Sequence, residues 1–335
     1  FSQKEICDNK TKIYSNRIYL RTMSINSKYF DKFCKSVEMG AIGAFKFIGK
    51  NDKIAADQCA VDFMRKELNK IEMRGKIVIG EGEMDKAPML YIGEELGNGT
   101  GQNLDIAVDP LEGTNFVAKN LPNSFSVIAV TEKGNMFSAP DTYMEKIAIG
   151  KNLPSKLVDL DFSVKKNIQN LADAKKTEPS KLTACVLKRP RHEKIIQELE
   201  KMEVKIKFIS DGDIYGAISV ADDNSPIDIY MGIGGAPEGV LSAAALCCQG
   251  GQIQTRLVLE TNQIDRAKKM GVEDIKKKYE LKDMIKGDVI FCASAITKGD
   301  MLDGVKVVDK EYYVSSLIMH KDNKIIKKTK NTYNM

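Results

Sequence analysis

The sequence predicts a layered α/β protein, and three observations support this prediction. Two long stretches near the start of the chain carry apolar residues at three- and four-residue steps, which is the spacing of one helix face. Short apolar runs follow, each ending at glycine, proline or acidic residues, as strands commonly do. After residue 182, strand-like and helix-like segments alternate. A chain of 335 residues with 43% hydrophobic composition can also bury a large core.

The first two elements are expected to be helices. The first begins near Ser24 or Asn26, carries one apolar face, and ends at Gly49. The second covers about residues 54–72 and ends before Gly75. Residues 1–23 are expected to be a polar extension ahead of these helices.

Further strands and helices are expected along the rest of the core, which we place at residues 24–330. The charged segment 151–181 is expected to connect two halves of this core. The expected strands are 76–79, 104–108, 124–131, 146–149, 183–187, 205–210 and 227–231, and the expected helices are 163–174, 192–202 and 237–248.

The charge balance argues against a nucleic-acid-binding protein. The net charge is +5 and 29% of the residues are charged, which is a mild basic excess. We therefore expect no nucleic-acid partner, and we interpret the basic tail as a solvated, frayed terminus. The lysines of this tail are Lys321, Lys324, Lys327, Lys328 and Lys330.

Cysteine usage and hydropathy indicate the cellular setting. The seven cysteines include no C-x-x-C pair, so a structural zinc site is not expected, and their odd number favours a reducing compartment. No apolar run reaches the ~18 residues of a membrane span, so no membrane association is expected. The chain begins at Phe1, which indicates a processed or truncated form. We expect a cytoplasmic location, or a plastid or other organelle if the first residues are the remnant of a leader.

Acidic residues recur where an apolar strand or a helix meets a glycine-rich turn. Glycine beside an acid lets the backbone bend tightly around an ion. Asp109 ends a predicted strand, Pro110 fixes the next turn, and Glu112 can point back toward the same ion. The acids in such positions are Glu81, Glu83, Asp85, Asp109, Glu112, Asp211, Asp213 and Glu238.

These side chains all offer oxygen, and none offers an imidazole nitrogen. Oxygen-only sites prefer Mg²⁺, Mn²⁺ or Ca²⁺ to zinc or copper. Mg²⁺ and Mn²⁺ are typical of phosphoryl chemistry, in which two ions ~3.5–4 Å apart can activate a water and neutralise the leaving oxygen. The Gly234-Gly235 loop opens onto a predicted helix, where backbone N–H groups can bind a phosphate.

Simpler interpretations of the same residues were weighed against this one. A single Asp-Gly or Glu-Gly pair is usually only a turn, and it is the repetition at several strand ends that favours a site. The glycines at 232–235 form no dinucleotide fingerprint, and the sequence has neither a P-loop nor a serine nucleophile elbow. The two histidines are His192, expected to begin a helix, and His320. Direct attack by water is therefore expected rather than a covalent intermediate.

Two motifs resemble the metal-binding signature of the lithium-sensitive sugar and inositol phosphatases, namely Ile79-Gly80-Glu81 and Asp109-Pro110-Leu111-Glu112-Gly113-Thr114. Most branches of this superfamily have Asp-Gly where this chain has Glu112-Gly113. That difference, together with segments 80–90 and 232–239, is similar to the class II, bacterial-type fructose-1,6-bisphosphatases. The resemblance covers about residues 25–330. Inositol monophosphatases carry a Trp-Asp pair, and this chain has no tryptophan.

The resemblance implies a layered α/β/α/β/α sandwich, assembled as dimers or tetramers, that uses Mn²⁺ or Mg²⁺. It implies a metal-binding half at 24–150 and a substrate-binding half at 182–330. The implied reaction is hydrolysis of the 1-phosphate of fructose 1,6-bisphosphate in gluconeogenesis, giving fructose 6-phosphate and phosphate. Alternatives are a sedoheptulose-1,7-bisphosphatase, a dual-specific bisphosphatase or an inositol phosphatase. A non-catalytic sugar-phosphate binder would lack metal carboxylates, and none is missing.

The resemblance also implies roles for individual positions. Thr114, Asp85 and Lys53 would be catalytic, with Thr114 helping to activate the attacking water. Arg189 departs from the family pattern, which has lysine there, so its charge is kept but its geometry differs. The implied metal ligands are Asp57, Glu81, Asp109, Glu112 and Glu238. The implied substrate contacts are Glu112, Gly113, Thr114, Tyr143, Arg189, Pro190, Arg191, Asp211, Gly212, Asp213 and Gly235.

Overall fold

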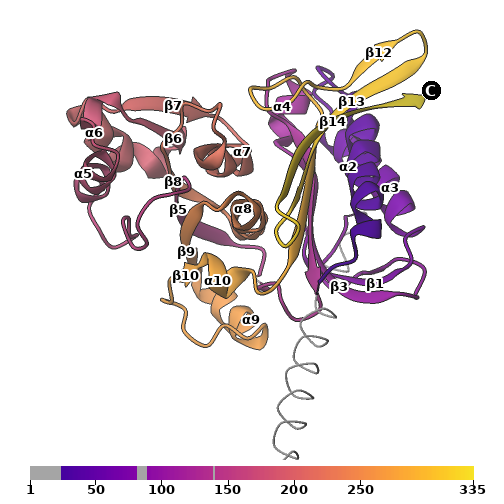
Figure 1. The fold of residues 1–335 in the computed structure, drawn as a ribbon, viewed down its shortest axis with the longest axis horizontal. Helices are drawn as coiled ribbons and strands as arrows, with labels where there is room; N and C mark the ends of the chain where they lie inside the picture. The colour runs from indigo at the N-terminus through magenta and orange to yellow at the C-terminus, as the bar shows by residue number, and fades with distance from the viewer. Residues whose placement is uncertain (1–23, 81–88, 139) are drawn as a thin grey trace, which may run out of the picture.

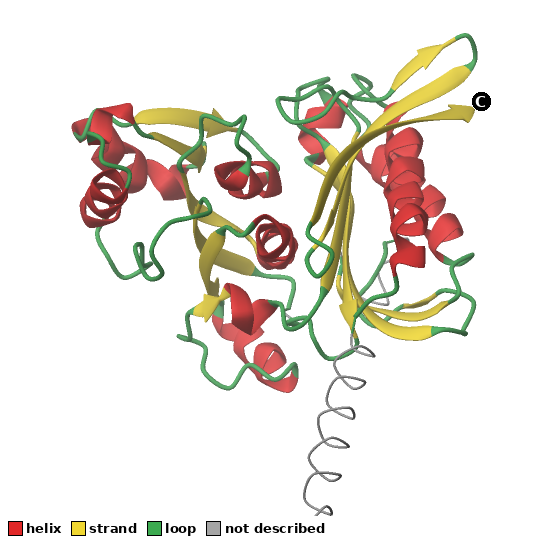
Figure 2. Ribbon diagram, in the orientation of Figure 1, coloured by secondary structure: helices red, strands yellow, loops and turns green. Residues whose placement is uncertain are grey.

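The computed structural model describes residues 24–80, 89–138 and 140–335, which form five layers (Figures 1 and 2). Helices α2 (Phe30–Phe45) and α3 (Lys53–Leu68) cover one face of an eight-stranded sheet. Helix α8 (Ala236–Gln249) lies between this sheet and a six-stranded sheet. Helices α5 (Val164–Ala174) and α6 (Glu193–Lys201) form the other outer layer. The expected α/β/α/β/α arrangement is confirmed.

The first sheet takes its strands from both ends of the chain. Its strand order is β12-β13-β11-β4-β3-β1-β2, and β14 pairs with β13. Strands β1 and β3 run parallel, whereas β3, β4, β11 and β13 pair antiparallel with their neighbours in that order. The bounds are β1 Met73–Ile79, β2 Glu95–Leu96, β3 Gln102–Glu112, β4 Phe125–Glu132, β11 Val289–Ala295, β12 Lys306–Val308, β13 Glu311–His320 and β14 Ile325–Asn334.

The second sheet has the strand order β10-β9-β5-β8-β6-β7. Strand β5 pairs antiparallel with β8 and β9, and β6 pairs parallel with β7 and β8. The bounds are β5 Tyr143–Ile149, β6 Thr183–Leu187, β7 Lys205–Ile209, β8 Ile229–Gly235, β9 Gln252–Val258 and β10 Tyr279–Glu280.

Short helices connect these strands. Helix α4 follows β3 and helix α7 follows β7, so both begin beside acidic motifs. No helix in the described ranges is both long enough and apolar enough to cross a bilayer. The bounds are η1 Ser27–Tyr29, α4 Thr114–Ala118, η2 Pro179–Lys181, η3 Pro190–His192, α7 Asp213–Ile218, η4 Ser219–Ala221, η5 Thr261–Gln263, α9 Ile264–Lys269 and α10 Leu281–Met284.

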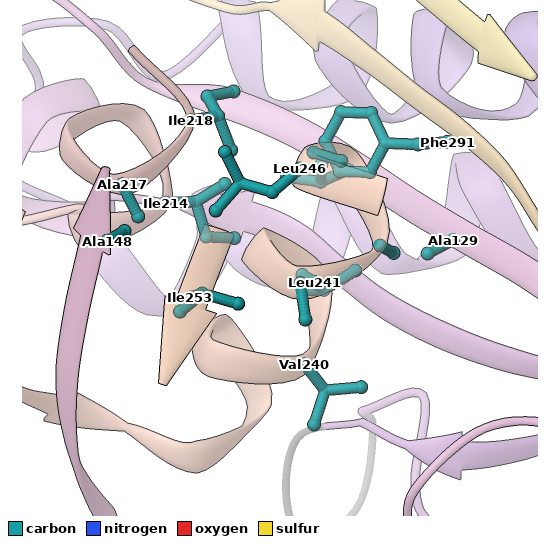
Figure 3. Close-up of a cluster of buried hydrophobic side chains, with 14 of the residues drawn as sticks. Ala129, Ala148, Ile214, Ala217, Ile218, Val240, Leu241, Leu246, Ile253 and Phe291 are labelled. Atoms are coloured by element: carbon teal, nitrogen blue, oxygen red, sulfur yellow. The ribbon is translucent and has the colours of Figure 1, made fainter. Parts of the chain in front are cut away.

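Helix α8 forms the centre of the main core because both sheets pack against it. Figure 3 shows Leu241 and Leu246 of α8 in one cluster with Phe291 of the first sheet and Ile253 of the second. Three consecutive alanines, residues 243–245, are fully buried and let both sheets approach the helix closely. Interiors are close-packed, so this burial also fixes the position of the first turn of α8.

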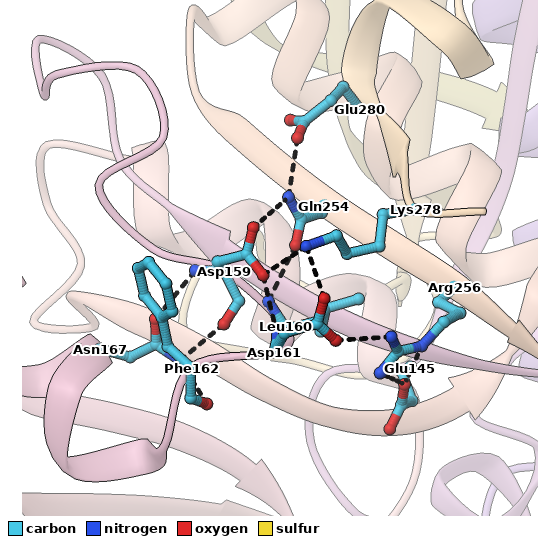
Figure 4. A network of polar contacts seen from close by, with 10 residues as sticks. All are labelled: Glu145, Asp159, Leu160, Asp161, Phe162, Asn167, Gln254, Arg256, Lys278 and Glu280. Carbon is cyan, nitrogen blue, oxygen red and sulfur yellow. Dashed lines mark hydrogen bonds and ion pairs between the residues drawn. The ribbon is translucent and has the colours of Figure 1, made fainter. Parts of the chain in front are cut away.

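The segment that leads from β5 to α5 is tied to the second sheet by an ionic network (Figure 4). Lys278 Nζ lies 2.6 Å from an Asp159 oxygen and 2.8 Å from an Asp161 oxygen. Arg256 bridges Asp161, at 2.7 Å, and Glu145, at 2.8 Å. Partly exposed pairs of this kind each contribute less than ~1 kcal/mol, so the network orders the segment more than it stabilises the fold.

The lysine-rich tail corrects one expectation, because it is not a frayed terminus. Strand β14 pairs with β13 along its full length. The lysines on β14 lie at an exposed sheet edge, where charge discourages pairing with another chain. Tyr333 and Asn331 of β14 donate hydrogen bonds to the buried Glu38 carboxylate of α2, the latter at 2.9 Å. The alternation of a strand was hidden because polar residues lie on both of its faces.

Candidate active site

Three carboxylates from distant parts of the chain meet where β3 ends and α8 begins. One side-chain oxygen each of Asp109, Glu112 and Glu238 lies within 4.8 Å of the others. In a regular strand, residues three apart point to opposite faces. The register of β3 against β4 shifts between Asp109 and Glu112, and this irregularity, at Pro110, accounts for how both can face one point.

Backbone N–H groups hold two of these carboxylates. Leu111 N donates to Asp109 Oδ1 at 3.0 Å, and Ile214 N, in the first turn of α7, donates to Glu112 Oε1 at 3.0 Å. Gly113 turns the chain from β3 into α4 with φ +78°, a conformation that favours glycine. Glu112 ends a strand of the first sheet, and its carboxylate is held by the N–H of a helix that follows a strand of the second sheet.

Two glycines at the end of β8 leave room for carboxylates. A Cβ atom on Gly234 would lie 2.0 Å from Asp213 Oδ2, and one on Gly235 would lie 1.9 Å from Glu238 Oε2. Real Cβ atoms do not approach this closely, so any side chain at either position would displace an acid. The two glycines thus allow the Asp213 and Glu238 carboxylates to lie against the backbone of β8.

Burial and like charge raise the pKa values of Glu112 and Glu238. Burial, and then the charges of Glu238 and Asp213, raise the pKa of Glu112 well above its usual range. Burial also raises the pKa of Glu238, an effect that the nearby Lys146 opposes. Burial raises the pKa of Asp57, on α3, to about 6. A cation bound by these carboxylates would lower their pKa values, because a nearby positive charge favours the ionised form.

Two unpartnered oxygens indicate where such a cation fits. Glu238 Oε2 and Asp57 Oδ1 are buried without a hydrogen-bond partner in the described part of the chain. Buried polar atoms are normally satisfied, and an oxygen-only set suits Mg²⁺ or Mn²⁺. Asp57 lies outside the cluster of Asp109, Glu112 and Glu238, on a helix that packs against β3 and α4. Glu81 lies outside the described residues.

A buried ion pair beneath the cluster was missed by the sequence analysis. Lys146 Nζ lies 2.7 Å from Asp213 Oδ2, and both side chains are almost completely buried. Tyr230 OH donates to the same oxygen at 2.8 Å. One signal was available: Lys146 is a single lysine before the apolar run Ile147-Ala148-Ile149, where a buried charge needs a partner.

The basic loop before α6 lies against the end of β8. Arg191 donates from Nε and Nη2 to the Ile233 carbonyl, at 3.0 and 2.7 Å. Its guanidinium carbon lies 4.9 Å from the centre of the Tyr143 ring, and Tyr143 pairs with Gly235 in the ladder of β5 and β8. The sheet thus brings Arg191 to the strand end that leads, three residues later, to Glu238.

The neighbouring acid Asp211 links the two halves of the site. Its Oδ1 lies 3.5 Å from Arg189 Nη2, and its Oδ2 accepts a hydrogen bond of 3.0 Å from the Asn115 side chain of α4. Gly212 follows with φ +64° and leads into α7. Asn115 was not predicted, although it directly follows the acidic motif on β3.

Of the remaining expected site residues, some lie in the described part of the chain and others lie outside it. Thr114 begins α4 directly after Gly113 and is partly buried, while Lys53 is exposed at the start of α3. Pro190 begins the η3 turn between Arg189 and the start of α6. Asp85, like Glu81, lies outside the described residues, so its expected role stays a prediction.

Comparisons with known proteins show the family to which the chain belongs. Residues 27–333 match the family model described as bacterial fructose-1,6-bisphosphatase, glpX-encoded. A protein of Synechococcus sp. (strain JA-3-3Ab) named D-fructose 1,6-bisphosphatase class 2/sedoheptulose 1,7-bisphosphatase is 40% identical over 317 residues, which cover 87% of this chain and 91% of the relative. A protein of the same name from Prochlorococcus marinus (strain MIT 9312) is 41% identical over 310 residues, or 88% and 93% of the two chains.

Among solved structures, the extragenic suppressor protein suhB from Bartonella henselae aligns with 58% of this chain and 70% of its own, at 11% identity and a TM-score of 0.32. That likeness is too low to support an argument. The family match spans nearly the whole chain, and the relatives are matched over about nine tenths of their length. On this evidence the chain belongs to the bacterial, glpX-encoded family of fructose-1,6-bisphosphatases.

Proposed function

We propose that this protein hydrolyses the 1-phosphate of fructose 1,6-bisphosphate to give fructose 6-phosphate and inorganic phosphate, with Mg²⁺ or Mn²⁺ as cofactor. The observation that supports this most is the oxygen-only cluster of Asp109, Glu112 and Glu238 beside a loop that carries Arg191. Membership in a phosphatase family gives the class of reaction, and the cluster supports the proposal that the reaction takes place where β3 ends and α8 begins.

Asp109, Glu112 and Glu238 are proposed to hold the cation, together with Asp57 and Glu81 as the resemblance implies. When bound, a divalent cation supplies positive charge to the phosphate oxygens and favours the ionised form of a nearby water. The unpartnered oxygens of Glu238 and Asp57 are the atoms that gain most from such a neighbour.

Thr114 is proposed to orient the water that attacks phosphorus. It begins α4 directly after Gly113, two residues after Glu112 in the same acidic motif. The attack forms one P–O bond and breaks the ester P–O bond, and the sugar oxygen leaves with a proton. Lys53 and Asp85 are kept as proposed catalytic residues on the resemblance.

The second phosphate of the substrate is proposed to meet the Arg189-Pro190-Arg191 loop. Arg191 uses Nε and Nη2 for the Ile233 carbonyl, which leaves its Nη1 hydrogens for another acceptor. A charge-assisted hydrogen bond of this kind contributes ~1.5–3 kcal/mol. Tyr143, Asp211, Gly212, Asp213 and Gly235 are kept as the proposed sugar contacts on the resemblance.

Sedoheptulose 1,7-bisphosphate is the second candidate substrate, because the names of the relatives carry both activities. Its two phosphates are one carbon further apart, so a dual-specific enzyme needs some freedom in the loop that binds the distal phosphate. An inositol monophosphate has no second phosphate for that loop to bind. A dimer or tetramer is proposed on the resemblance, and a cytoplasmic or organellar location is proposed on the cysteine usage and the first residues of the sequence.

Phosphate release from a panel of substrates tests the proposal. The panel contains fructose 1,6-bisphosphate, sedoheptulose 1,7-bisphosphate, fructose 6-phosphate, inositol 1-phosphate and p-nitrophenyl phosphate, each with Mg²⁺, Mn²⁺ or excess EDTA. We expect the bisphosphates to have the highest kcat/KM, no activity in EDTA, and a loss of ~10²-fold or more in kcat for Asp109→Asn. Full activity in EDTA, or a preference for inositol 1-phosphate, would contradict the proposal.

A further inference from the structure

His192 is completely buried between exposed or half-exposed basic residues and has no place in the proposed chemistry. It occupies the position before the first turn of α6, but its side chain makes no capping hydrogen bond there. The imidazole instead lies between the ends of two strands of the second sheet. The sequence predicted its place at the start of this helix, and the side chain has contacts beyond that place.

Both ring nitrogens have backbone partners that fix the protonation of the ring. Nδ1 lies 2.7 Å from the Leu187 carbonyl oxygen at the end of β6, and Nε2 lies 2.7 Å from the Ile233 nitrogen on β8. A carbonyl only accepts and a peptide N–H only donates, so Nδ1 carries the proton and Nε2 is the acceptor. Burial and the charges of Arg191 and Arg189 lower the pKa of His192, which agrees with a neutral ring.

The imidazole takes the place of ladder bonds where two strands separate. Strands β6 and β8 pair at Ala184 with Ile229 and at Cys185 with Tyr230, and the ladder between them ends there. His192 bridges the later residues Leu187 and Ile233 across the gap. Gly232 makes room for the ring, because a Cβ atom there would lie 3.2 Å from His192 Cε1.

His192 and Arg191 both bind the backbone of the same residue, Ile233. The N–H of Ile233 donates to His192, and the carbonyl of Ile233 accepts both hydrogen bonds from Arg191. Loss of the imidazole acceptor would free this part of β8 from β6 and, with it, the anchor of the guanidinium.

We propose that His192 is a positioning residue for the second phosphate of the substrate: a neutral imidazole that bridges β6 and β8 and thereby sets the place of Arg191. This inference rests on the proposed function, since it assigns Arg191 to the distal phosphate. His192 touches no substrate and acts through Ile233 and Arg191. It thus belongs to substrate recognition and not to bond cleavage.

Two substitutions at His192 test its two hydrogen bonds separately, because each can keep only one of them. In His192→Gln the longer side chain can place its carbonyl oxygen near the position of Nε2 and accept from Ile233. In His192→Asn the amide can donate to Leu187 but is too short to reach Ile233. We expect Asn to raise KM for fructose 1,6-bisphosphate ~10-fold at nearly unchanged kcat, and Gln to stay within ~3-fold of the wild type. Turnover of p-nitrophenyl phosphate, which lacks a distal phosphate, should change less than ~2-fold in both.

A double-mutant cycle with Arg191→Ala tests whether the effect passes through Arg191. Adding His192→Asn to Arg191→Ala should raise KM little further if His192 acts by placing that guanidinium. Additive effects, equal losses on both substrates, or an unchanged KM in His192→Asn would each overturn the inference. If the wild type hydrolyses p-nitrophenyl phosphate but neither bisphosphate, the proposed function itself fails and this inference with it. Melting temperatures of all variants show whether a loss reflects unfolding.

Discussion

Glu238→Gln should stabilise the metal-free protein and remove most of its stabilisation by metal. The ligand oxygens of Asp109, Glu112 and Glu238 lie within 4.8 Å of one another. Two unit charges at that distance repel by about 3.5 kcal/mol at an effective dielectric constant of about 20. Partial protonation already relieves part of this repulsion, so we expect a gain on the order of 1–2 kcal/mol. The unpartnered Oε2 would become an amide N–H₂ that can donate to a neighbouring carboxylate.

Chemical denaturation at about pH 8, in EDTA and with excess Mg²⁺ or Mn²⁺, measures both effects. The wild type should gain about 2.7 kcal/mol at a hundredfold excess of metal over Kd, and Glu238→Gln should gain little. Glu178→Gln, at an exposed carboxylate, is the matched control and should behave like the wild type. Near pH 4 the two metal-free proteins should converge, because the raised pKa of Glu238 keeps the folded wild type protonated there. A variant less stable than the wild type in EDTA, with equal gains from metal, would refute the reasoning.

The other predictions concern single residues. Because burial raises the pKa of Asp57 from 3.8 to about 6, metal-free stability should fall as pH rises between those values, and Asp57→Asn should flatten that part of a denaturation profile. Lys146→Met leaves the Asp213 carboxylate buried without its cation and should cost ~3–5 kcal/mol of unfolding free energy, less when combined with Asp213→Asn. Thr114→Ala should lower kcat far more than it raises KM, and a trapped phosphoenzyme would exclude attack by water. Arg191→Ala should raise KM for fructose 1,6-bisphosphate ~10- to 100-fold and leave p-nitrophenyl phosphate hydrolysis nearly unchanged, whereas equal losses would assign Arg191 to the metal side or the fold.

The sequence pattern identified the acids of the cluster because each one lies in a motif that can be recognised from its neighbours in the sequence. Asp109 and Glu112 end an apolar strand, and Glu238 lies in the first turn of a helix, so each motif shows its position without knowledge of the fold. Their meeting within 4.8 Å is a long-range event that only the packing of α8 between the sheets brings about. The residues alone suggested that Asp109 and Glu112 share an ion, and the resemblance added Glu238 to them.

Residues that support the site were hidden for the same reason. Lys146 and Tyr230 meet Asp213 from separate strands, and the backbone partners of His192 are set by strands whose order in the sheet differs from their order in the chain. Strand β8 was expected to end at Met231 but continues to Gly235, because glycine gives no strand signal of its own. The pattern of β14 was obscured by lysines, so its pairing with β13 was not predicted.

A crystal structure with Mn²⁺, analysed by anomalous diffraction, shows whether Asp109, Glu112 and Glu238 hold the cation. We expect a manganese peak coordinated by oxygens of Asp109, Glu112 and Glu238, at distances of about 2.0–2.3 Å, that is lost in Glu238→Gln crystals. A peak coordinated elsewhere, or no peak among these three carboxylates at a manganese concentration that supports full activity, would contradict this expectation.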